Sequence, residues 1–314
     1  MNKRIGLVLA SIHEGASIRL WRSVLSSVDL LSDSVVVFPG GRLNYKEQDE
    51  YLRNNIYSLE TKENFDGIIN WSSSLTGELT AEEVCSIIRS TEVPVISIGL
   101  PVEGSPSVTF DAYEGMYNEV EHFITKHNLR RIAFLRGPNS HASAESRYCA
   151  YEDCLKKYNI PINNDLISSP HHWAQGREAL REIINERGLV PGIDFDALIC
   201  ASDLMLSGAL RYLEEINVEV PGTLKVAGFN DSDNNKIMKV APTTVRMPVV
   251  GMSHVAVEIL NQIFNDPATI VEDVILPAEL VIRHSCGCDH SFGATEPAGK
   301  ELENKENFIS WIRS

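Results

Sequence analysis

Two histidines and two cysteines lie close together near the end of the sequence, at His284, Cys286, Cys288 and His290. Imidazoles and thiolates are the side chains that proteins most often use to bind zinc, so this segment is the first place to consider a metal site. Paired cysteines of zinc sites are usually separated by about two to four residues, however, and the single Gly287 between these two would crowd a tetrahedral ion. The spacing therefore favours a flexible linker that carries thiols, and we predict no metal and no cofactor.

The sequence carries none of the short motifs that mark common catalytic or phosphate-binding sites. It has no Gly-x-Ser-x-Gly nucleophile turn, no Gly-x-x-x-x-Gly-Lys phosphate loop and no His-Glu-x-x-His zinc helix. Acidic residues and histidines are numerous, but the sequence reveals no acid–base pair among them. We therefore predict that the protein is not an enzyme. An unrecognised enzyme, whose catalytic residues meet only in the folded chain, stays an alternative.

The chain is acidic, with 28 Lys and Arg residues against 43 Asp and Glu residues and a net charge of −15. A surface of this sign repels the phosphates of nucleic acids and anionic lipids, so we expect the chain by itself to bind neither DNA nor a membrane. The apolar run at residues 5–10 is too short for the core of a signal peptide, and no later stretch could span a membrane. The six cysteines are scattered, which favours reduced thiols and a cytoplasmic protein.

Short apolar runs rich in β-branched residues alternate with longer segments of helical periodicity. The expected strands are residues 5–10, 35–38, 67–71, 95–98, 108–110, 132–135, 197–201, 226–229 and 274–276. The expected helices are residues 21–31, 80–88, 112–127, 143–158, 173–187, 204–216 and 250–264. The helix at residues 80–88 begins with a capping box, in which Thr80 and Glu83 satisfy free backbone amides.

Continuously apolar strands that alternate with helices are typical of parallel sheets covered by helices on both faces. These units are too many for one sheet of usual size, so the predicted fold class is α/β, with two doubly wound parallel-sheet lobes. Ligands of such sheets bind beyond the carboxyl ends of the strands. Polar residues follow several of the expected strands, namely Ser11, residues 72–74, Ser202 with Asp203, and Asn230 with Asp231. Together they predict a polar cleft, in which Asp203 is expected to cap the helix that follows it.

Several segments carry an ordered set of motifs. They are residues 65–69 (Phe-Asp-Gly-Ile-Ile), 147–151 (Arg-Tyr-Cys-Ala-Tyr), 197–203 followed by Gly208-Ala-Leu, 220–221 (Val-Pro), 226–231 (Val-Ala-Gly-Phe-Asn-Asp) and 242–248. This set resembles the ligand-binding core of the LacI/GalR transcription regulators and covers about residues 4–285. Three features depart from the family pattern. The helix-turn-helix header that would precede Arg4 is absent from the sequence, and Asn230 stands where the family usually has Asp. The ending at residues 286–288 (Cys-Gly-Cys) and the tail after it are not typical of simple repressors.

The resemblance implies two lobes of the periplasmic-binding-protein-like type I fold, with the chain crossing between them. The expected N-terminal lobe comprises residues 1–109 and 245–274, and the C-terminal lobe comprises residues 110–244 and 275–285. Residues 286–314 would form a linker or tail. The tail is expected to transmit the ligand signal toward an output domain beyond residue 314, with a disordered chain end as the alternative. Its apolar residues, such as Phe308 and Trp311, suit packing on a partner helix.

The resemblance also implies a ligand site between the lobes. Its residues would be Ser11 and Trp21 from the first lobe, Phe110 near a lobe crossing, and Arg147, Trp173, Ser202 and Asn230 from the second lobe. An aromatic ring and fixed hydrogen-bonding groups suit a sugar, and the same set would also hold a nucleobase. Three alternatives stay open, in which Arg147 is a solvated surface residue, Trp173 anchors the start of a helix and Trp21 belongs to the core.

The implied function is that of a cytoplasmic sensor domain for a small molecule, expected to be a sugar. It would belong to a LacI-type transcription regulator or a related signalling protein, in which the ligand closes the lobes and changes a homodimer. DNA would be bound only through a domain that this chain does not contain. A sugar-binding protein of a transporter is the main alternative, and it would need an export signal.

Overall fold

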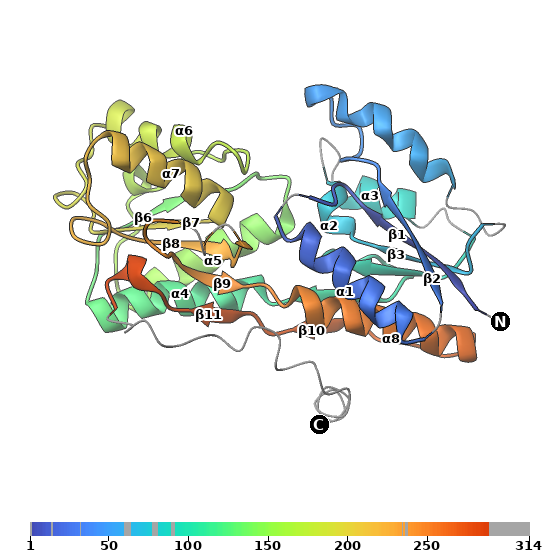
Figure 1. Ribbon diagram of the computed structural model, residues 1–314. Coiled ribbons are helices and arrows are strands. Elements are labelled where there is room, and N and C mark those ends of the chain that lie inside the picture. Colours follow the sequence, from blue (N-terminus) through green and yellow to red (C-terminus); the bar gives the residue numbers. More distant parts are fainter. Residues whose placement is uncertain are drawn as a thin grey trace.

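The computed structural model describes residues 2–288 apart from 14, 32, 60–63, 77–80, 89–91, 234, 236 and 237. The chain forms two α/β lobes that lie side by side, each built on a mostly parallel sheet, which confirms the predicted fold class (Figure 1). No helix in the described part of the chain is long and apolar enough to cross a membrane. The expected capping residue Thr80 and the apolar tail with Phe308 and Trp311 lie outside the described residues.

The first lobe is built around a six-stranded parallel sheet in the order β10-β5-β4-β3-β1-β2. Its strands are β1 (Arg4–Leu9), β2 (Ser34–Pro39), β3 (Gly67–Asn70), β4 (Val95–Ile98), β5 (Ser107–Phe110) and β10 (Val274–Leu276). One face is covered by α1 (Ser17–Asp29) and α8 (Val249–Asn265), and the other by α2 (Ser72–Leu75), α3 (Ala81–Ile88) and the 3-10 segment η1 (Glu47–Leu59). Leu7 and Leu9 of β1 pack on the α1–α8 side and Val8 packs on the opposite side. Because helices cover both faces, the strands are mostly apolar.

The second lobe has a five-stranded sheet in the order β11-β9-β8-β7-β6, in which the described strands run parallel except for β11. Its strands are β6 (Ile132–Leu135), β7 (Ala197–Cys200), β8 (Lys225–Asn230), β9 (Thr243–Arg246) and β11 (Glu279–Val281). Its helices are α4 (Ala112–His127), α5 (Ala142–Lys157), α6 (Gly176–Arg181) and α7 (Asp203–Glu215), with short helical turns at η2 (Asn164–Leu166), η3 (Glu182–Glu186) and η5 (His284–Cys286). Large buried side chains such as Phe134, Tyr151 and Phe195 join these elements in one core.

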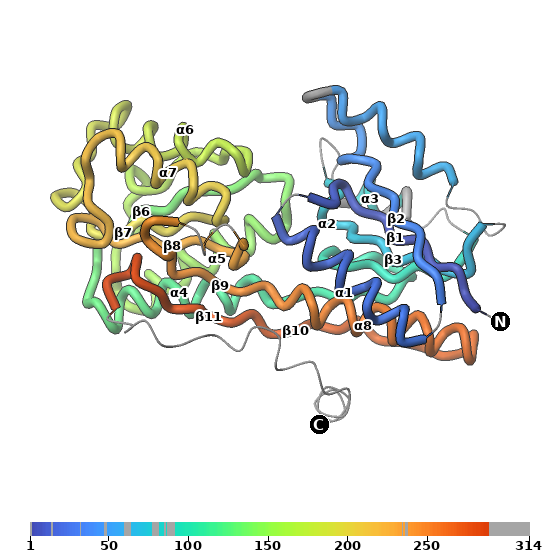
Figure 2. Tube along the Cα trace, in the orientation of Figure 1, coloured from blue at the N-terminus to red at the C-terminus, as the bar shows by residue number. Residues whose placement is uncertain are grey.

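The chain passes between the lobes after β5, after β9 and after β10, and the colours of the tube in Figure 2 trace these passages. The strands before these passages end at Phe110, Arg246 and Leu276. The lobe boundaries expected from the sequence, residues 109, 244 and 274, lie one or two residues before these strand ends. Phe110 contacts the cores of both lobes, so an aromatic side chain anchors the first passage.

The helix expected over residues 173–187 is shorter and begins later than the sequence suggests. Helix α6 begins at Gly176 rather than at Trp173, and the segment continues from Glu182 as the π-helical η3. A Cβ atom on Gly176 would lie 1.9 Å from the carbonyl oxygen of Met205 in α7, and Gly208 of α7 lies at the same contact. These two glycines let α6 and α7 approach closely, and Trp173 is left in the loop before α6.

Residues 286–288 do not form the flexible linker that the sequence suggests. The turn η5 follows β11, and Cys286 at its end is fully buried in the core of the second lobe. Cys288 is partly buried and packs against the same core. The chain therefore belongs to the second lobe as far as the last residue that the structure describes.

Candidate functional site

Arg147 of α5 is a buried cation at the carboxyl edge of the second-lobe sheet. Its side chain is 3% exposed, and its Nη1 donates to the carbonyl oxygen of Ala201 at 2.6 Å. The guanidinium carbon lies 3.7 Å from the centre of the Phe229 ring. Burial lowers the pKa of Arg147 to about 9, so the group stays charged at neutral pH in a place where charge is unfavourable. This burial excludes the alternative of a solvated surface arginine.

Asn230 ends β8 beside Arg147. Its Oδ1 accepts a hydrogen bond from Arg147 Nη2 at 3.4 Å. The backbone φ angle is 113° at Asn230 and 50° at Asp231, which are values that residues with side chains seldom adopt. Strained backbone of this kind persists where the surrounding structure enforces it, often at functional sites. The Asn230 amide, which can donate as well as accept, is thus held next to a fixed cation.

The N-cap of α7 is Ser202 and not Asp203. Ser202 Oγ accepts a hydrogen bond from the backbone amide of Met205 at 3.2 Å, so the capping role predicted for Asp203 is wrong. Asp203 instead accepts a hydrogen bond at 2.7 Å from the backbone amide of Ser232, in the loop that follows Asn230. A Cβ atom on Gly228 would lie 2.4 Å from Asp203 Oδ1, so glycine in β8 leaves room for this carboxylate. The buried Asp203 side chain thereby positions the loop.

Asp231 forms a second anchor for the same loop. Its carboxylate is 3% exposed and accepts hydrogen bonds from Arg246 Nε at 2.8 Å and from Arg283 Nη2 at 2.7 Å. Burial alone would raise the pKa of Asp231, but the two arginines outweigh burial and lower it. The carboxylate is therefore ionised at neutral pH and fixes the strand exit that carries Asn230.

Trp173 lies against the same group of residues. Its ring is edge-to-face with His141 at 5.2 Å, and the Arg147 guanidinium lies 5.8 Å from its centre. A Cβ atom on Gly137 would come within 2.6 Å of the indole, so this glycine leaves space for the ring. Burial lowers the pKa of His141 to about 4, and its imidazole is therefore neutral at pH 7. The second lobe thus brings an aromatic ring and a neutral imidazole beside Arg147.

The first lobe supplies fewer of the predicted residues. Ser11 is buried after β1, and its Oγ accepts a hydrogen bond from the backbone amide of His13 at 3.3 Å. Trp21 donates its indole N–H to the Ile12 carbonyl oxygen at 2.9 Å and packs against the first-lobe core. The structure therefore favours the core alternative for Trp21, while Ser11 lies at the expected edge.

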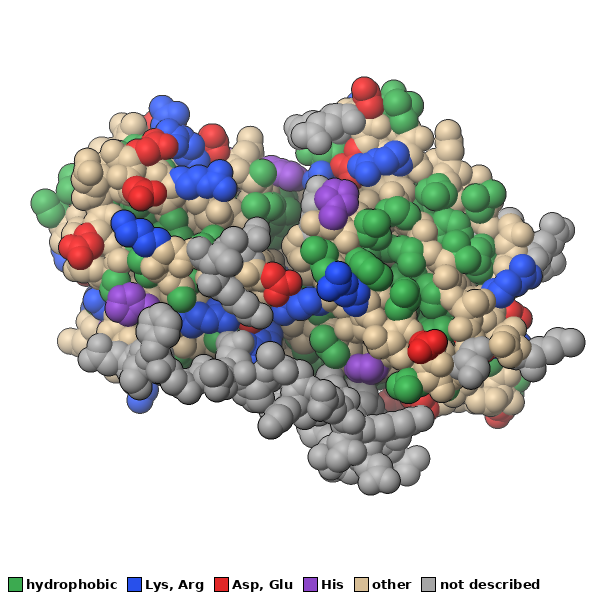
Figure 3. Space-filling view, viewed as in Figure 1, with side chains coloured by type: hydrophobic (Ala, Val, Ile, Leu, Met, Phe, Trp, Pro, Cys, Tyr) green, Lys and Arg blue, Asp and Glu red, His purple; other side chains and the backbone are tan. Residues whose placement is uncertain are grey.

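Two arginines of the first lobe reach across to the second lobe. Arg19 Nη2 donates to the carbonyl oxygens of Asn230 at 3.2 Å and Asp231 at 2.8 Å. Arg42 Nη1 lies 3.0 Å from His172 Nε2, within hydrogen-bonding distance. Figure 3 shows a notch between the two lobes on the viewed face, with histidine and basic side chains at its border. These contacts hold the lobes together at the edge where the candidate ligand residues lie.

Several buried polar atoms at this edge have no hydrogen-bond partner among the residues that the structure describes. They are Arg19 Nε, Asn70 Oδ1, His141 Nδ1, Ser143 Oγ and Arg147 Nε. Buried polar groups are normally hydrogen-bonded, because leaving one unpaired costs about 1–3 kcal/mol. Such a set, drawn from both lobes, is what a polar ligand would satisfy.

The fold and these motifs can now be compared with known proteins. The family model for the periplasmic binding protein-like domain matches residues 120–286, more than half of the 314 residues. The chain belongs to this family.

The chain is also similar to individual transcription regulators. The HTH-type transcriptional regulator RegA of Clostridium saccharobutylicum is 27% identical over 287 residues, which cover 90% of this chain and 81% of RegA. The HTH-type transcriptional regulator GalR of Escherichia coli (strain K12) is 30% identical over 188 residues, 59% of this chain and 53% of GalR. A crystal structure of a LacI family transcriptional regulator from Enterococcus faecium with bound ribose superposes with a TM-score of 0.72 at 20% identity, covering 90% of this chain and 98% of that chain. The predicted resemblance to LacI/GalR effector domains is confirmed.

The structure brings four of the predicted ligand residues of this periplasmic binding protein-like domain to one edge of the second lobe. They are Arg147, Trp173, Ser202 and Asn230. Phe110 joins them through the Phe229 ring, whose centre is 6.2 Å from its own. Sequence reasoning missed Arg19, Asn70 and His141. Asn70 ends β3 only two residues before the polar run at 72–74, which is the one signal that could have indicated it.

Proposed function

We propose that this chain is the sensor domain of a LacI-type transcription regulator, which binds a sugar between its lobes and performs no reaction on it. The observation that carries the proposal is the buried Arg147–Asn230 pair, which faces the first lobe at the point where Arg19 contacts the second. RegA and GalR are named as transcription regulators, and the related Enterococcus faecium structure contains ribose. These relatives support regulation as the output and a sugar as the ligand class.

The chemistry of the site supports a sugar. A sugar ring has apolar C–H faces and a rim of hydroxyl groups, so it is bound best by an aromatic ring together with fixed donors and acceptors. Trp173 offers the aromatic ring, and Arg147 offers a rigid donor that is already held by the Ala201 carbonyl. Asn230 and the neutral His141 each add groups that can donate or accept.

Closure of the lobes is the mechanism that these contacts favour. Arg19 bonds to the backbone of Asn230 and Asp231, so a ligand held by the Asn230 side chain lies directly beside an interlobe contact. A ligand that touches both lobes binds the closed form more tightly than the open form and raises the closed population by that difference in affinity. In a homodimer, the shift between open and closed lobes would be passed to DNA through a DNA-binding domain.

A thermal-shift screen tests the proposed ligand class. The purified chain is heated with single sugars, sugar phosphates and nucleosides, and a ligand at a hundred times its Kd adds about 2.7 kcal/mol of stability. Asn230→Gly keeps the positive φ angle accessible but removes the side-chain amide, so it should raise the Kd of the ligand about tenfold. Arg177→Ala, which changes an exposed ion pair with Glu215 in the same lobe, is the matched control.

Recovery of the ligand unchanged after prolonged incubation, measured by mass spectrometry, is expected for a sensor. Conversion of the sugar to a product would contradict the proposal. So would a screen in which nucleosides stabilise the chain and no sugar does, or an Asn230→Gly variant that binds the sugar with unchanged affinity.

A further inference from the structure

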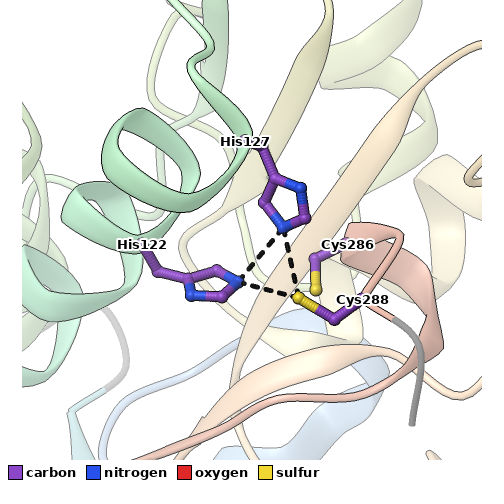
Figure 4. Close-up of side chains that lie close together, drawn as sticks. All are labelled: His122, His127, Cys286 and Cys288. Carbon is purple, nitrogen blue, oxygen red and sulfur yellow. Dashed lines mark hydrogen bonds between the residues drawn. The ribbon is translucent and has the colours of Figure 1, made fainter.

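Four side chains with metal-binding atoms meet at the end of α4, away from the candidate ligand site. His122 and His127 come from α4, and Cys286 and Cys288 come from the turn after β11 (Figure 4). One nitrogen or sulfur atom of each residue lies within 4.8 Å of the corresponding atoms of the other three. His122 is 7% exposed and Cys286 is fully buried, so the group is largely shielded from water.

The distances between these atoms are those of a tetrahedral zinc site. His122 Nε2 and His127 Nε2 are 3.3 Å apart, and Cys288 Sγ lies 3.6 Å from the first and 3.4 Å from the second. Zinc bonds of about 2.3 Å to sulfur and about 2.0–2.1 Å to nitrogen require N–N separations of about 3.3 Å and N–S separations of about 3.6 Å. The three side chains are thus spaced as the corners of one tetrahedron.

The fourth corner is available from Cys286. Its thiol now donates to the carbonyl oxygen of Arg283 at 3.3 Å, a weak bond that it would give up on binding a metal. Gly287, with a φ angle of +83°, makes the turn that lets both neighbouring sulfur atoms face α4. The left-handed conformation of Gly287 therefore lets both cysteines reach one ion although a single residue separates them. The other two ligands, His122 and His127, come from a helix that is distant in the sequence.

We infer that His122, His127, Cys286 and Cys288 bind one zinc ion. The ion would replace the two thiol protons, so each Zn²⁺ bound releases two protons and leaves the Cys₂His₂ site with no net charge. Its soft and borderline ligands, with no open position, are typical of a structural rather than a catalytic site. The metal would fasten Cys288, the last described residue, to the end of α4.

Cobalt spectroscopy on the whole chain tests this inference. The protein is stripped of metal by a chelator under reducing conditions and titrated with Co²⁺, which reports its geometry through visible d–d bands and its sulfur ligands through a near-ultraviolet charge-transfer band. We expect intense tetrahedral bands that saturate at one Co²⁺ per chain and disappear when one equivalent of Zn²⁺ is added. Cys288→Ser and His122→Asn should weaken Co²⁺ binding at least tenfold and reduce the characteristic bands.

Two variants serve as matched controls. His284 is an exposed histidine that lies two residues before Cys286 in the sequence but outside the proposed site. Cys149 is an exposed free cysteine of α5. His284→Asn and Cys149→Ser should bind Co²⁺ as the wild-type chain does. Weak octahedral bands or no saturable binding in the wild-type chain would overturn the inference, whether or not the variants fold. A disulfide between Cys286 and Cys288 that persists under the reducing conditions of the titration, or loss of Co²⁺ binding in His284→Asn, would overturn it as well. The result does not depend on whether a sugar binds between the lobes.

Discussion

Replacing Arg147 by methionine should separate ligand binding from stability. The difference between the ordinary pKa of 12.5 and about 9 corresponds to roughly 5 kcal/mol of unfavourable free energy for the charged side chain in the folded protein. Methionine removes this burden, because a neutral side chain of similar length fills the space. It also leaves the Ala201 carbonyl without its donor and removes the cation from the Phe229 ring, which together cost about 2–4 kcal/mol.

The first effect is the larger, so the Arg147→Met chain without ligand should be about 1–3 kcal/mol more stable than wild type. Its sugar affinity should fall about ten- to hundredfold, since a charge-assisted hydrogen bond worth about 1.5–3 kcal/mol is lost. Urea unfolding followed by circular dichroism measures the stability, and isothermal titration calorimetry measures the affinity. Arg177→Met, at an exposed ion pair with Glu215, should change stability by less than about 1 kcal/mol and leave the affinity unchanged.

Either of two results would refute the reasoning about Arg147. A loss of more than about 3 kcal/mol of unfolding free energy in the ligand-free variant would show that the arginine stabilises the fold. An unchanged sugar affinity in a folded variant would remove Arg147 from the ligand site.

Three further predictions follow from the contacts described above. Asp231→Asn should lower the free energy of unfolding at pH 7 by about 2–4 kcal/mol, because Arg246 and Arg283 lose a buried carboxylate. Since the pKa of Asp231 is lowered in the folded chain, the extra stability of wild type is present above the ordinary pKa of 3.8 and should shrink as the pH falls below that value. An equal difference in unfolding free energy between wild type and Asp231→Asn at pH 7 and at pH 3, measured by urea unfolding, would contradict this prediction. Gly176→Ala should destabilise the chain by at least about 2 kcal/mol because its Cβ would lie 1.9 Å from the Met205 carbonyl oxygen, whereas Gly251→Ala, at 3.3 Å from Leu276, should be milder in the same thermal unfolding assay. Trp173→Leu should weaken sugar binding about tenfold and abolish any change in tryptophan fluorescence that the sugar causes, and a full fluorescence response in this variant would exclude stacking on Trp173.

Most strands were predictable because burial on both faces of the sheet requires a short run of apolar, β-branched residues, which the sequence shows. The strands β4, β6 and β10 begin and end at the residues expected. Strand β9 was missed, because its buried residues include Thr243 and Thr244, whose hydroxyls form specific hydrogen bonds instead of an apolar run. The 3-10 segment η1 was missed because it is mostly polar and only side chains such as Ile56 and Tyr57 pack on the core.

The candidate site was predictable where one motif carries one residue. Arg147 and Asn230 stand in separate sequence motifs. Asn230 ends β8, and Arg147 lies on α5, the helix after β6. The interlobe role of Arg19 could not be predicted, since it depends on how the two lobes are placed and α1 offers no local signal for it. Ser72 shows the opposite error, because this strand-exit residue is fully buried and bonds to Ser97 instead of facing a cleft.

The histidine–cysteine cluster shows the same limit most clearly. The sequence displays Cys286 and Cys288 close together, but their partners lie on a helix more than 150 residues earlier, so no short sequence motif contains all four residues. The folded chain brings the Cys288 sulfur, two residues beyond the end of η5, to His122 and His127 at the end of α4.

Hydrogen exchange, measured with and without a saturating sugar from the thermal-shift screen, tests directly whether the ligand binds between the lobes and closes them. Backbone hydrogen bonds open more rarely where a bound ligand or an interlobe contact stabilises them, so their amides exchange more slowly. The exchange rates of segments in the two lobes therefore show whether the ligand contacts both lobes. We predict slower exchange in both residues 11–20 of the first lobe and residues 226–232 of the second lobe, including the partners that Arg19 joins. Protection confined to one lobe, or unchanged exchange at both segments while the sugar is bound, would contradict binding in the interlobe site.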